Sequence, residues 1–123
     1  MGQATILLAE DTRDVRLLMV SVLRQKGYQV LDAPDGLSAL EIAERYPGSI
    51  DLVITDVNMP RLDGPGLCHR LKQLRPGIKT LLVSGATTGR DADDATFLAK
   101  PFTAHHLLSS ARRLLELPST VEA

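Results

Sequence analysis

The 123-residue sequence has one cysteine, no excess of basic residues and no long apolar run. Cys68 has no second cysteine to pair with, and the N-terminus lacks the pattern of a signal peptide, so we expect a protein of the reducing cytoplasm. Fourteen Lys and Arg against fifteen Asp and Glu give a net charge of −1, which argues against direct binding to nucleic acid. Apolar runs of only four or five residues exclude a membrane span.

What is present is the composition of an ordinary globular domain, with 44% hydrophobic and 24% charged residues. A chain of this length forms one domain and buries about two thirds of its unfolded surface, so it needs neither a metal nor a disulfide to fold. We expect a single domain over residues 1–123, with a core of about 4–117 and a flexible tail over 118–123. Any metal should serve function rather than stability.

Short, continuous apolar runs recur along the chain. They lie at residues 6–9, 29–31, 52–54, 81–83 and 97–99. A continuous apolar run is typical of a strand whose two faces are both covered, as in a parallel sheet. A strand with one face exposed to solvent instead alternates apolar and polar residues.

Helical spacing of apolar residues separates these runs. The stripes are Val15, Leu18, Met19 and Val22; Ala39, Ile42, Ala43 and Tyr46; Leu67, Leu71 and Leu74; and Leu107, Ala111 and Leu114. Asp35 and Thr103 stand where helix N-caps are expected, and Gly27 follows a helical stretch, where a left-handed residue is favoured. This alternation predicts an α/β fold, a parallel sheet with helices on both faces.

The fourth connection, residues 85–95, differs from the others. Its length is close to the minimum of about 10–12 residues for a parallel crossover, and it contains no Leu, Ile, Val or Phe. We therefore predict that the fourth helix is short or missing.

Polar side chains follow four of the five predicted strands. Glu10 and Asp11 follow the first, Asp56 the third, Ser84 the fourth and Lys100 the fifth. Sites in open α/β sheets form at these carboxyl ends. Three neighbouring carboxylates stay ionised when a hard cation neutralises them, and Mg²⁺ fits an open acidic pocket that leaves room for a phosphate oxygen. One carboxylate can then attack phosphorus, while Lys100 and Ser84 stabilise the transferred oxygens.

These residues resemble, over almost the whole chain, the receiver domain of bacterial two-component response regulators. The matching positions are the acidic pair Glu10-Asp11, the phosphoacceptor Asp56, the following turn with Met59-Pro60 and Gly64, the hydroxyl of Ser84, and Lys100-Pro101. The resemblance implies a CheY-like, flavodoxin-like, doubly wound sheet of five parallel strands in the order 2-1-3-4-5.

The resemblance also implies the site's chemistry. Asp11 and Asp56 would bind Mg²⁺ directly, the Asn58 carbonyl would add a ligand, and Glu10 would act through water. Asp56 would accept a phosphoryl group from a histidine kinase or a histidine phosphotransfer protein and lose it by hydrolysis. The protein would therefore not be an enzyme with a separate turned-over substrate.

The implied output is a change of binding surface. Phosphorylation adds about 1.5 to 2 negative charges, toward which Ser84 and Lys100 can move, and Phe97 occupies the family's switch-aromatic position. A downstream protein target would read this change. We expect a monomer or a weak dimer. Because the segment 85–95 is short and polar, a dimer would form through another surface, such as the side of the first and last helices.

Two other functions remain open from the sequence. A haloacid-dehalogenase-type Mg²⁺ phosphatase also uses an aspartyl nucleophile, but it carries Asp-x-Asp after its first strand, whereas this chain has Asp56-Val57-Asn58 after its third. An unphosphorylated scaffold, or pseudo-receiver, is the second, and the intact acids, hydroxyl and lysine argue against it. A free-standing receiver and a part of a larger protein, such as a hybrid sensor kinase, both fit the sequence.

Overall fold

The computed structural model describes residues 3–85 and 97–118, and the statements below concern those residues. One sheet of five parallel strands has the order β2-β1-β3-β4-β5, which confirms the predicted topology. The strands are β1 (Thr5–Ala9), β2 (Gln29–Ala33), β3 (Leu52–Asp56), β4 (Lys79–Ser84) and β5 (Phe97–Ala99). The helices are α1 (Arg13–Gln25), α2 (Gly36–Arg45), α3 (Gly64–Leu74) and α4 (Ala104–Glu116), so α4 is the helix that follows β5.

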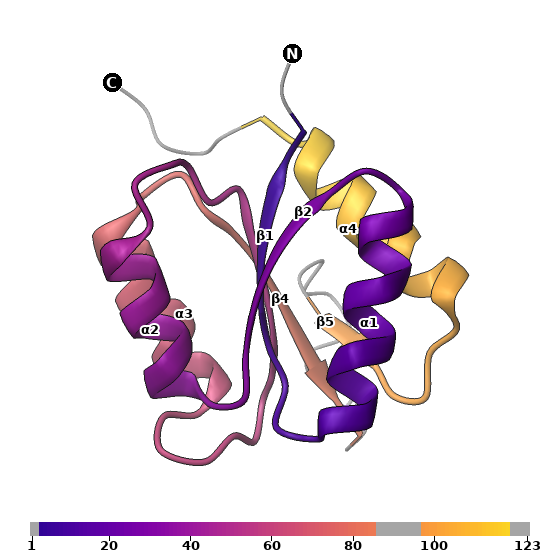
Figure 1. Ribbon diagram of the computed structural model, residues 1–123, viewed down its shortest axis with the longest axis horizontal. Helices are drawn as coiled ribbons and strands as arrows, with labels where there is room; N and C mark the ends of the chain where they lie inside the picture. Colours follow the sequence, from indigo (N-terminus) through magenta and orange to yellow (C-terminus); the bar gives the residue numbers. More distant parts are fainter. Residues whose placement is uncertain (1–2, 86–96, 119–123) are drawn as a thin grey trace.

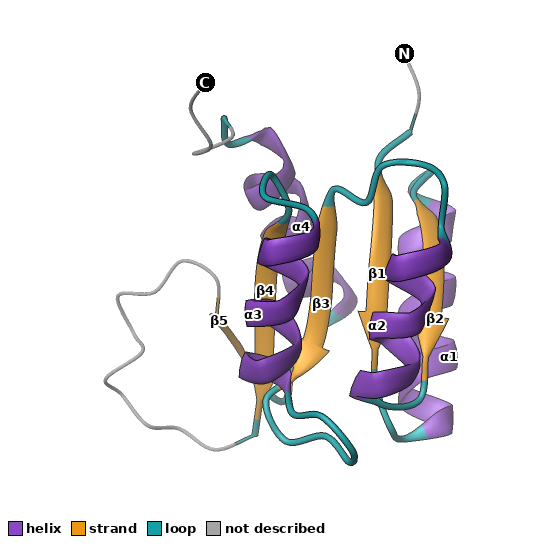
Figure 2. Ribbon diagram, turned by 90° about the vertical axis from the view of Figure 1, so that its left-hand side faces the viewer, coloured by secondary structure: helices purple, strands orange, loops and turns teal. Residues whose placement is uncertain are grey.

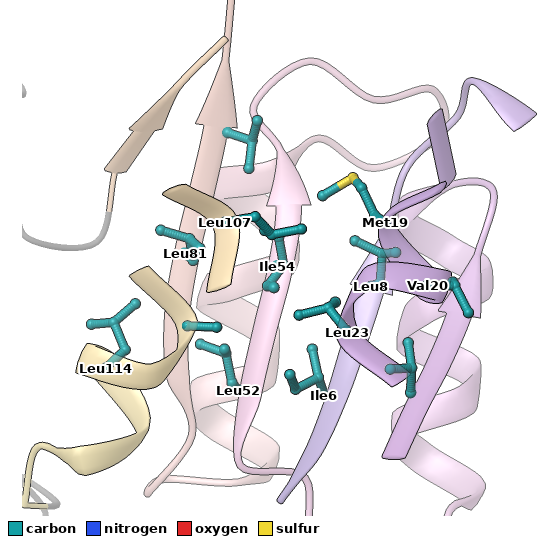
Figure 3. Packing of buried hydrophobic residues seen from close by; sticks show 13 residues of the cluster. Ile6, Leu8, Met19, Val20, Leu23, Leu52, Ile54, Leu81, Leu107 and Leu114 are labelled. Carbon is teal, nitrogen blue, oxygen red and sulfur yellow. The ribbon is translucent and has the colours of Figure 1, made fainter. Parts of the chain in front are cut away.

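The helices cover both faces of the sheet, as predicted. Figure 1 shows α1 and α4 on one side of the strands and α2 and α3 on the other. Alternate residues of a strand enter different cores: Ile6 and Leu8 pack with α1 and α4, while Leu7 and Ala9 pack with α2 and α3. Every residue of β1 and β3 is buried, which explains why their sequences are continuously rather than alternately apolar. Figure 3 shows the packing of the first core.

The predicted helix ends are present. Asp35 Oδ1 accepts a hydrogen bond of 2.7 Å from the amide of Ser38, and Thr103 Oγ1 accepts one of 3.0 Å from that of His106. Gly27, directly after α1, has a φ of 95°. A third cap was not predicted: Asp63 begins α3 by accepting from the Gly66 amide at 2.8 Å.

The apolar stripes predicted from the sequence are only partly buried. In α1 the buried residues are Met19, Val20 and Leu23, and Leu18 is 64% exposed. The apolar arc of α1 is wider than its contact with the sheet, so part of it points past the strands toward α4. Leu74, the last residue of α3, is likewise 46% exposed, although Leu71 in the same turn is fully buried.

Two predictions fall on residues that the structure does not describe. The predicted shortness of the fourth helix concerns residues 85–95, of which only Gly85 is described, and most of the predicted tail also lies outside the described ranges. Among the helices of the described residues, none has both the length and the apolar character needed to cross a bilayer.

Candidate functional site

The carboxyl ends of the parallel strands bring the predicted polar residues to one edge of the sheet. The strands run in the same direction in Figure 2 and end at the lower edge of that view. Asp56 and Ser84 are the last residues of β3 and β4, whereas Glu10 directly follows β1 and Lys100 directly follows β5. The predicted meeting of these residues is therefore supported by the topology of the sheet.

Three carboxylates form the centre of the site. Glu10, Asp11 and Asp56 each offer an oxygen atom, and these atoms all lie within 4.8 Å of one another. Glu10 is 1% and Asp56 7% exposed, while Asp11 is open to solvent. Two buried acids thus form the floor of the site and one exposed acid forms its rim.

One ammonium group faces the two buried acids. Lys100 Nζ lies 3.1 Å from Asp56 Oδ1 and 3.6 Å from Glu10 Oε1. Both contacts are ion pairs, and neither oxygen accepts a hydrogen bond among the described residues. The other oxygen of Glu10, Oε2, accepts from the Thr12 amide at 3.0 Å. The two buried acids therefore share one ammonium, which leaves negative charge that a further cation could neutralise.

The electrostatics of the site agree with this deficit of positive charge. Burial raises the pKa of Asp56 to about 7; Glu10 acts in the same direction and Lys100 opposes it. Burial also lowers the pKa of Lys100, but the two carboxylates more than offset this, so that its pKa is raised and the ammonium stays charged at neutral pH. A set of oxygen donors with too little positive charge suits a hard divalent cation such as Mg²⁺.

The other predicted site residues lie around this centre. Ser84 is buried, and its carbonyl accepts from the Lys100 amide at 2.8 Å, so the end of β4 lies beside the residue that follows β5. Phe97 is half-buried at the start of β5, opposite Leu82. Asn58 is exposed in the loop after β3. The predicted roles of Asn58 in metal binding and of Ser84 and Phe97 in switching stay predictions.

The loop after Asp56 is held close to the end of β3. A Cβ atom at Gly64 would collide with the backbone oxygen of Asp56, and the Gly64 amide donates to the Val57 carbonyl at 2.9 Å. Gly36, at the start of α2, is similarly close to the backbone oxygen of Leu62 in this loop. The two glycines therefore allow the loop to pack against the site and against α2.

Sequence reasoning missed one residue beside the site. Arg16, in the first turn of α1, donates from NH1 to the Glu10 carbonyl at 2.9 Å and forms an ion pair of 3.3 Å with Asp32. No spacing rule points to this contact, because it joins a helix to a backbone atom and to a second strand.

An apolar groove of about 550 Å³ opens between α1 and the start of α4, next to Lys100. Its lining among the described residues consists of Val15, Leu18, Met19, Val22, Gly85, Lys100, Pro101, Phe102, Ala104 and Leu107. The four residues of α1 in this lining are the apolar stripe predicted from the sequence. The groove thus joins a hydrophobic surface to the polar site.

Comparison with known proteins gives a consistent result. The family model described as the response regulator receiver domain matches residues 6–112. The sensor kinase CckA of Brucella abortus is 40% identical over 121 residues, which cover 94% of this chain and 13% of the kinase. The receiver protein CpdR of Brucella abortus is 35% identical over 116 residues, covering 89% of this chain and 95% of CpdR. The chain therefore spans a small part of one relative and nearly the whole of the other.

A solved structure supports the same fold. The receiver domain of the hybrid histidine kinase CckA superposes with a TM-score of 0.79 at 36% identity, over 92% of this chain and 100% of that domain.

Proposed function

Because this chain belongs to the response regulator receiver domain family, we propose that it takes a phosphoryl group onto Asp56 from a histidine kinase or a histidine phosphotransfer protein. Membership of the family makes the chain a receiver domain of two-component signal transduction. The observation that carries the proposal is the contact of 3.1 Å between Lys100 Nζ and Asp56 Oδ1 within a cluster of three carboxylates.

The donor set fits Mg²⁺. Asp11 and Asp56 would hold the ion directly, with Asn58 contributing its carbonyl and Glu10 acting through water. The buried oxygens Glu10 Oε1 and Asp56 Oδ1 support this assignment, because neither accepts a hydrogen bond among the described residues and the one ammonium beside them, that of Lys100, can neutralise only one of the two acids. Bound Mg²⁺ would neutralise the acidic cluster and the incoming phosphoryl oxygens.

The residues of the chain supply the rest of the chemistry. A carboxylate oxygen of Asp56 attacks phosphorus in line with the imidazole nitrogen of the donor, so that the P–N bond breaks as the new P–O bond forms. Lys100 is close enough to Asp56 to hold charge on a phosphoryl oxygen, and the Ser84 hydroxyl supplies a second contact. Attack of water on the aspartyl phosphate later releases phosphate and restores Asp56.

The modification would also change the surface of the domain. The Lys100 amide donates to Ser84, so a movement of either residue toward the new charge pulls on both β4 and β5. Phe97 lies at the start of β5 and would respond to this movement. A downstream protein target would bind the altered face.

The groove between α1 and α4 supports delivery by a protein partner. It includes Lys100 in its lining, so a helix docked there lies next to the acceptor. Its lining is mostly apolar, which fits the apolar face of a helical phosphodonor.

The test is incubation of the purified chain with Mg²⁺ and acetyl phosphate, followed by intact mass spectrometry. We expect one added phosphoryl group that hydroxylamine removes, because an acyl phosphate reacts with this nucleophile. The Asp56→Asn variant should acquire none. Asp63→Asn is the matched control, since Asp63 lies in the same loop and only caps α3, and it should be modified like the wild type.

Two outcomes would overturn the proposal. Absence of any adduct on the wild-type chain would favour the scaffold. Release of many phosphates per protein from varied phosphoesters, without an adduct that accumulates, would favour a phosphatase of the haloacid-dehalogenase type.

A further inference from the structure

The side chain of Arg16 connects the acidic pair Glu10-Asp11 to the neighbouring strand β2. The Arg16 guanidinium donates from NH1 to the Glu10 carbonyl at 2.9 Å, while its Nε lies 3.3 Å from Asp32 Oδ2. The Arg16 side chain is only 15% exposed. Glu10 follows β1 and Asp32 belongs to β2, so a single group from α1 links the carboxyl ends of two strands.

Arg16 binds a backbone oxygen that lies between the two acidic residues. The carbonyl of Glu10 belongs to the peptide group that joins Glu10 to Asp11, and a peptide group is planar. Fixing this oxygen therefore fixes the plane that sets the direction of both acidic residues. The amide of Glu10 donates to the Ala33 carbonyl at 3.1 Å, so β2 holds the other side of the same residue.

We infer that Arg16 is a positioning residue, which holds the Glu10–Asp11 peptide so that both carboxylates point toward Asp56. This inference deepens the proposed function and rests on it for the identity of the ion. Arg16 contacts the backbone carbonyl of Glu10 and the carboxylate of Asp32, so its effect on the carboxylates of Glu10 and Asp11 passes through the backbone.

The sign of the effect separates positioning from simple charge. Removing a cation near an acidic site makes the local potential more negative, which would strengthen the binding of Mg²⁺. Loss of positioning weakens the binding, because the carboxylates no longer converge. We expect Arg16→Ala to weaken Mg²⁺ binding by about tenfold, the lower end of the loss that follows removal of other groups that orient metal ligands.

A matched control lies on the same helix. Arg24 of α1 donates from NH2 to the Val30 carbonyl of β2 at 3.0 Å, so it also joins α1 to β2 through a backbone oxygen. This contact lies near the amino end of β2, away from the site. Arg24→Ala removes the same charge and the same kind of contact, and we expect its Mg²⁺ affinity to stay within twofold of the wild type.

The experiment is calorimetric titration of Mg²⁺ into the wild type, Arg16→Ala, Arg16→Lys, Asp32→Ala and Arg24→Ala, with folding checked by circular dichroism. Lysine can reach one of the two partners but cannot span both, so Arg16→Lys should fall between alanine and the wild type. Asp32→Ala should also weaken binding, but it removes a negative charge together with the anchor, so Arg16→Ala is the variant that separates positioning from charge. Wild-type or tighter affinity in Arg16→Ala, or an equal loss in Arg24→Ala, would overturn the inference.

A second measurement needs no metal. The Thr12 amide donates to Glu10 Oε2 at 3.0 Å, so its hydrogen exchange reports how firmly the Glu10 side chain is held. In metal-free protein we expect faster exchange at Thr12 in Arg16→Ala than in Arg24→Ala. If the wild type failed to bind Mg²⁺, the proposed function would fall, whereas unchanged exchange at Thr12 would by itself remove the positioning role.

Discussion

Two buried carboxylates share one ammonium at this site, and this imbalance is the main electrostatic feature at the scale of single residues. Asp56 and Glu10 both approach Lys100, which can neutralise only one of them. Burial raises the pKa of Asp56 to about 7, with Glu10 adding to the effect and Lys100 opposing it. The metal-free protein therefore keeps a proton on Asp56 at a pH where a solvated aspartate has lost it.

This pKa predicts how stability depends on pH in the absence of metal. In the unfolded chain Asp56 loses its proton near its ordinary pKa of 3.8, whereas in the folded protein it keeps the proton up to about pH 7. The folded state thus binds more protons in this window, so stability falls as pH rises from about 4 to 7, and the penalty is complete above that range. Asp56→Asn removes this penalty.

We expect metal-free Asp56→Asn to exceed the wild type in unfolding free energy by about 2 kcal/mol at pH 8, after allowance for solvent screening at the open side of the site. The difference in unfolding free energy between the two proteins should vanish near pH 4. Urea denaturation in the presence of EDTA, followed by circular dichroism, measures both values. Parallel pH curves for the two proteins would contradict the raised pKa of Asp56. Saturating Mg²⁺ should stabilise the wild type more than the variant.

At the scale of elements, the connection from β3 to α3 is fixed by close backbone contact. Gly64 begins α3 and approaches the backbone oxygen of Asp56 so closely that no side chain fits. Its amide bonds to the Val57 carbonyl, and the Val57 amide bonds to the Val83 carbonyl of β4. The position of Asp56 therefore depends on how α3 starts.

Gly64→Ala tests this dependence. The new methyl group must displace the end of β3 or the start of α3, which should cost about 1–3 kcal/mol of stability and slow the phosphorylation of Asp56 by acetyl phosphate. Gly48→Ala is the control: its Cβ would lie 2.9 Å from the edge of the Tyr46 ring, which can turn away. Equal phosphorylation rates for Gly64→Ala and the wild type would show that the start of α3 does not position the acceptor.

The sequence predicted the strands and the helix caps well because these features depend on local rules. Burial on both faces requires continuous apolar runs, and Asp35 and Thr103 cap helices through their own side chains. The apolar stripe of α1 was less predictable. Spacing identifies the apolar arc of a helix, but only tertiary packing decides which part of it is covered, and Leu18 was left exposed.

The same distinction applies to the site. Glu10, Asp11, Asp56 and Lys100 could be predicted to meet because parallel strands end at a common edge. Arg16 could not, because its partners are a backbone carbonyl and an acid on another strand. The steric role of Gly64 also depends on a distance across the loop, which no sequence pattern reports.

At the scale of the whole molecule, the apolar groove lies beside the polar site on one side of the sheet. The groove lies on the side of α1 and α4, directly beside Lys100, and it exposes Leu18. Leu74 is also exposed, but it ends α3 on the opposite face of the sheet. If the phosphoryl donor docks in the groove, the rate of phosphoryl transfer depends on Leu18 and does not depend on Leu74.

Leu18→Glu should slow transfer from a protein donor by about tenfold or more, because a buried anchor of an interface typically contributes over 1 kcal/mol and the new charge would be desolvated. Leu18 is 64% exposed and is not one of the residues assigned to the chemistry, so labelling by acetyl phosphate should stay at the wild-type rate. The donor is selected from a panel of purified, autophosphorylated histidine kinases as the one that labels the wild type fastest. Leu74→Glu is the matched control and should match the wild type with both donors. Equal kinase transfer to Leu18→Glu and Leu74→Glu would place the donor elsewhere, since only the first substitution changes the groove.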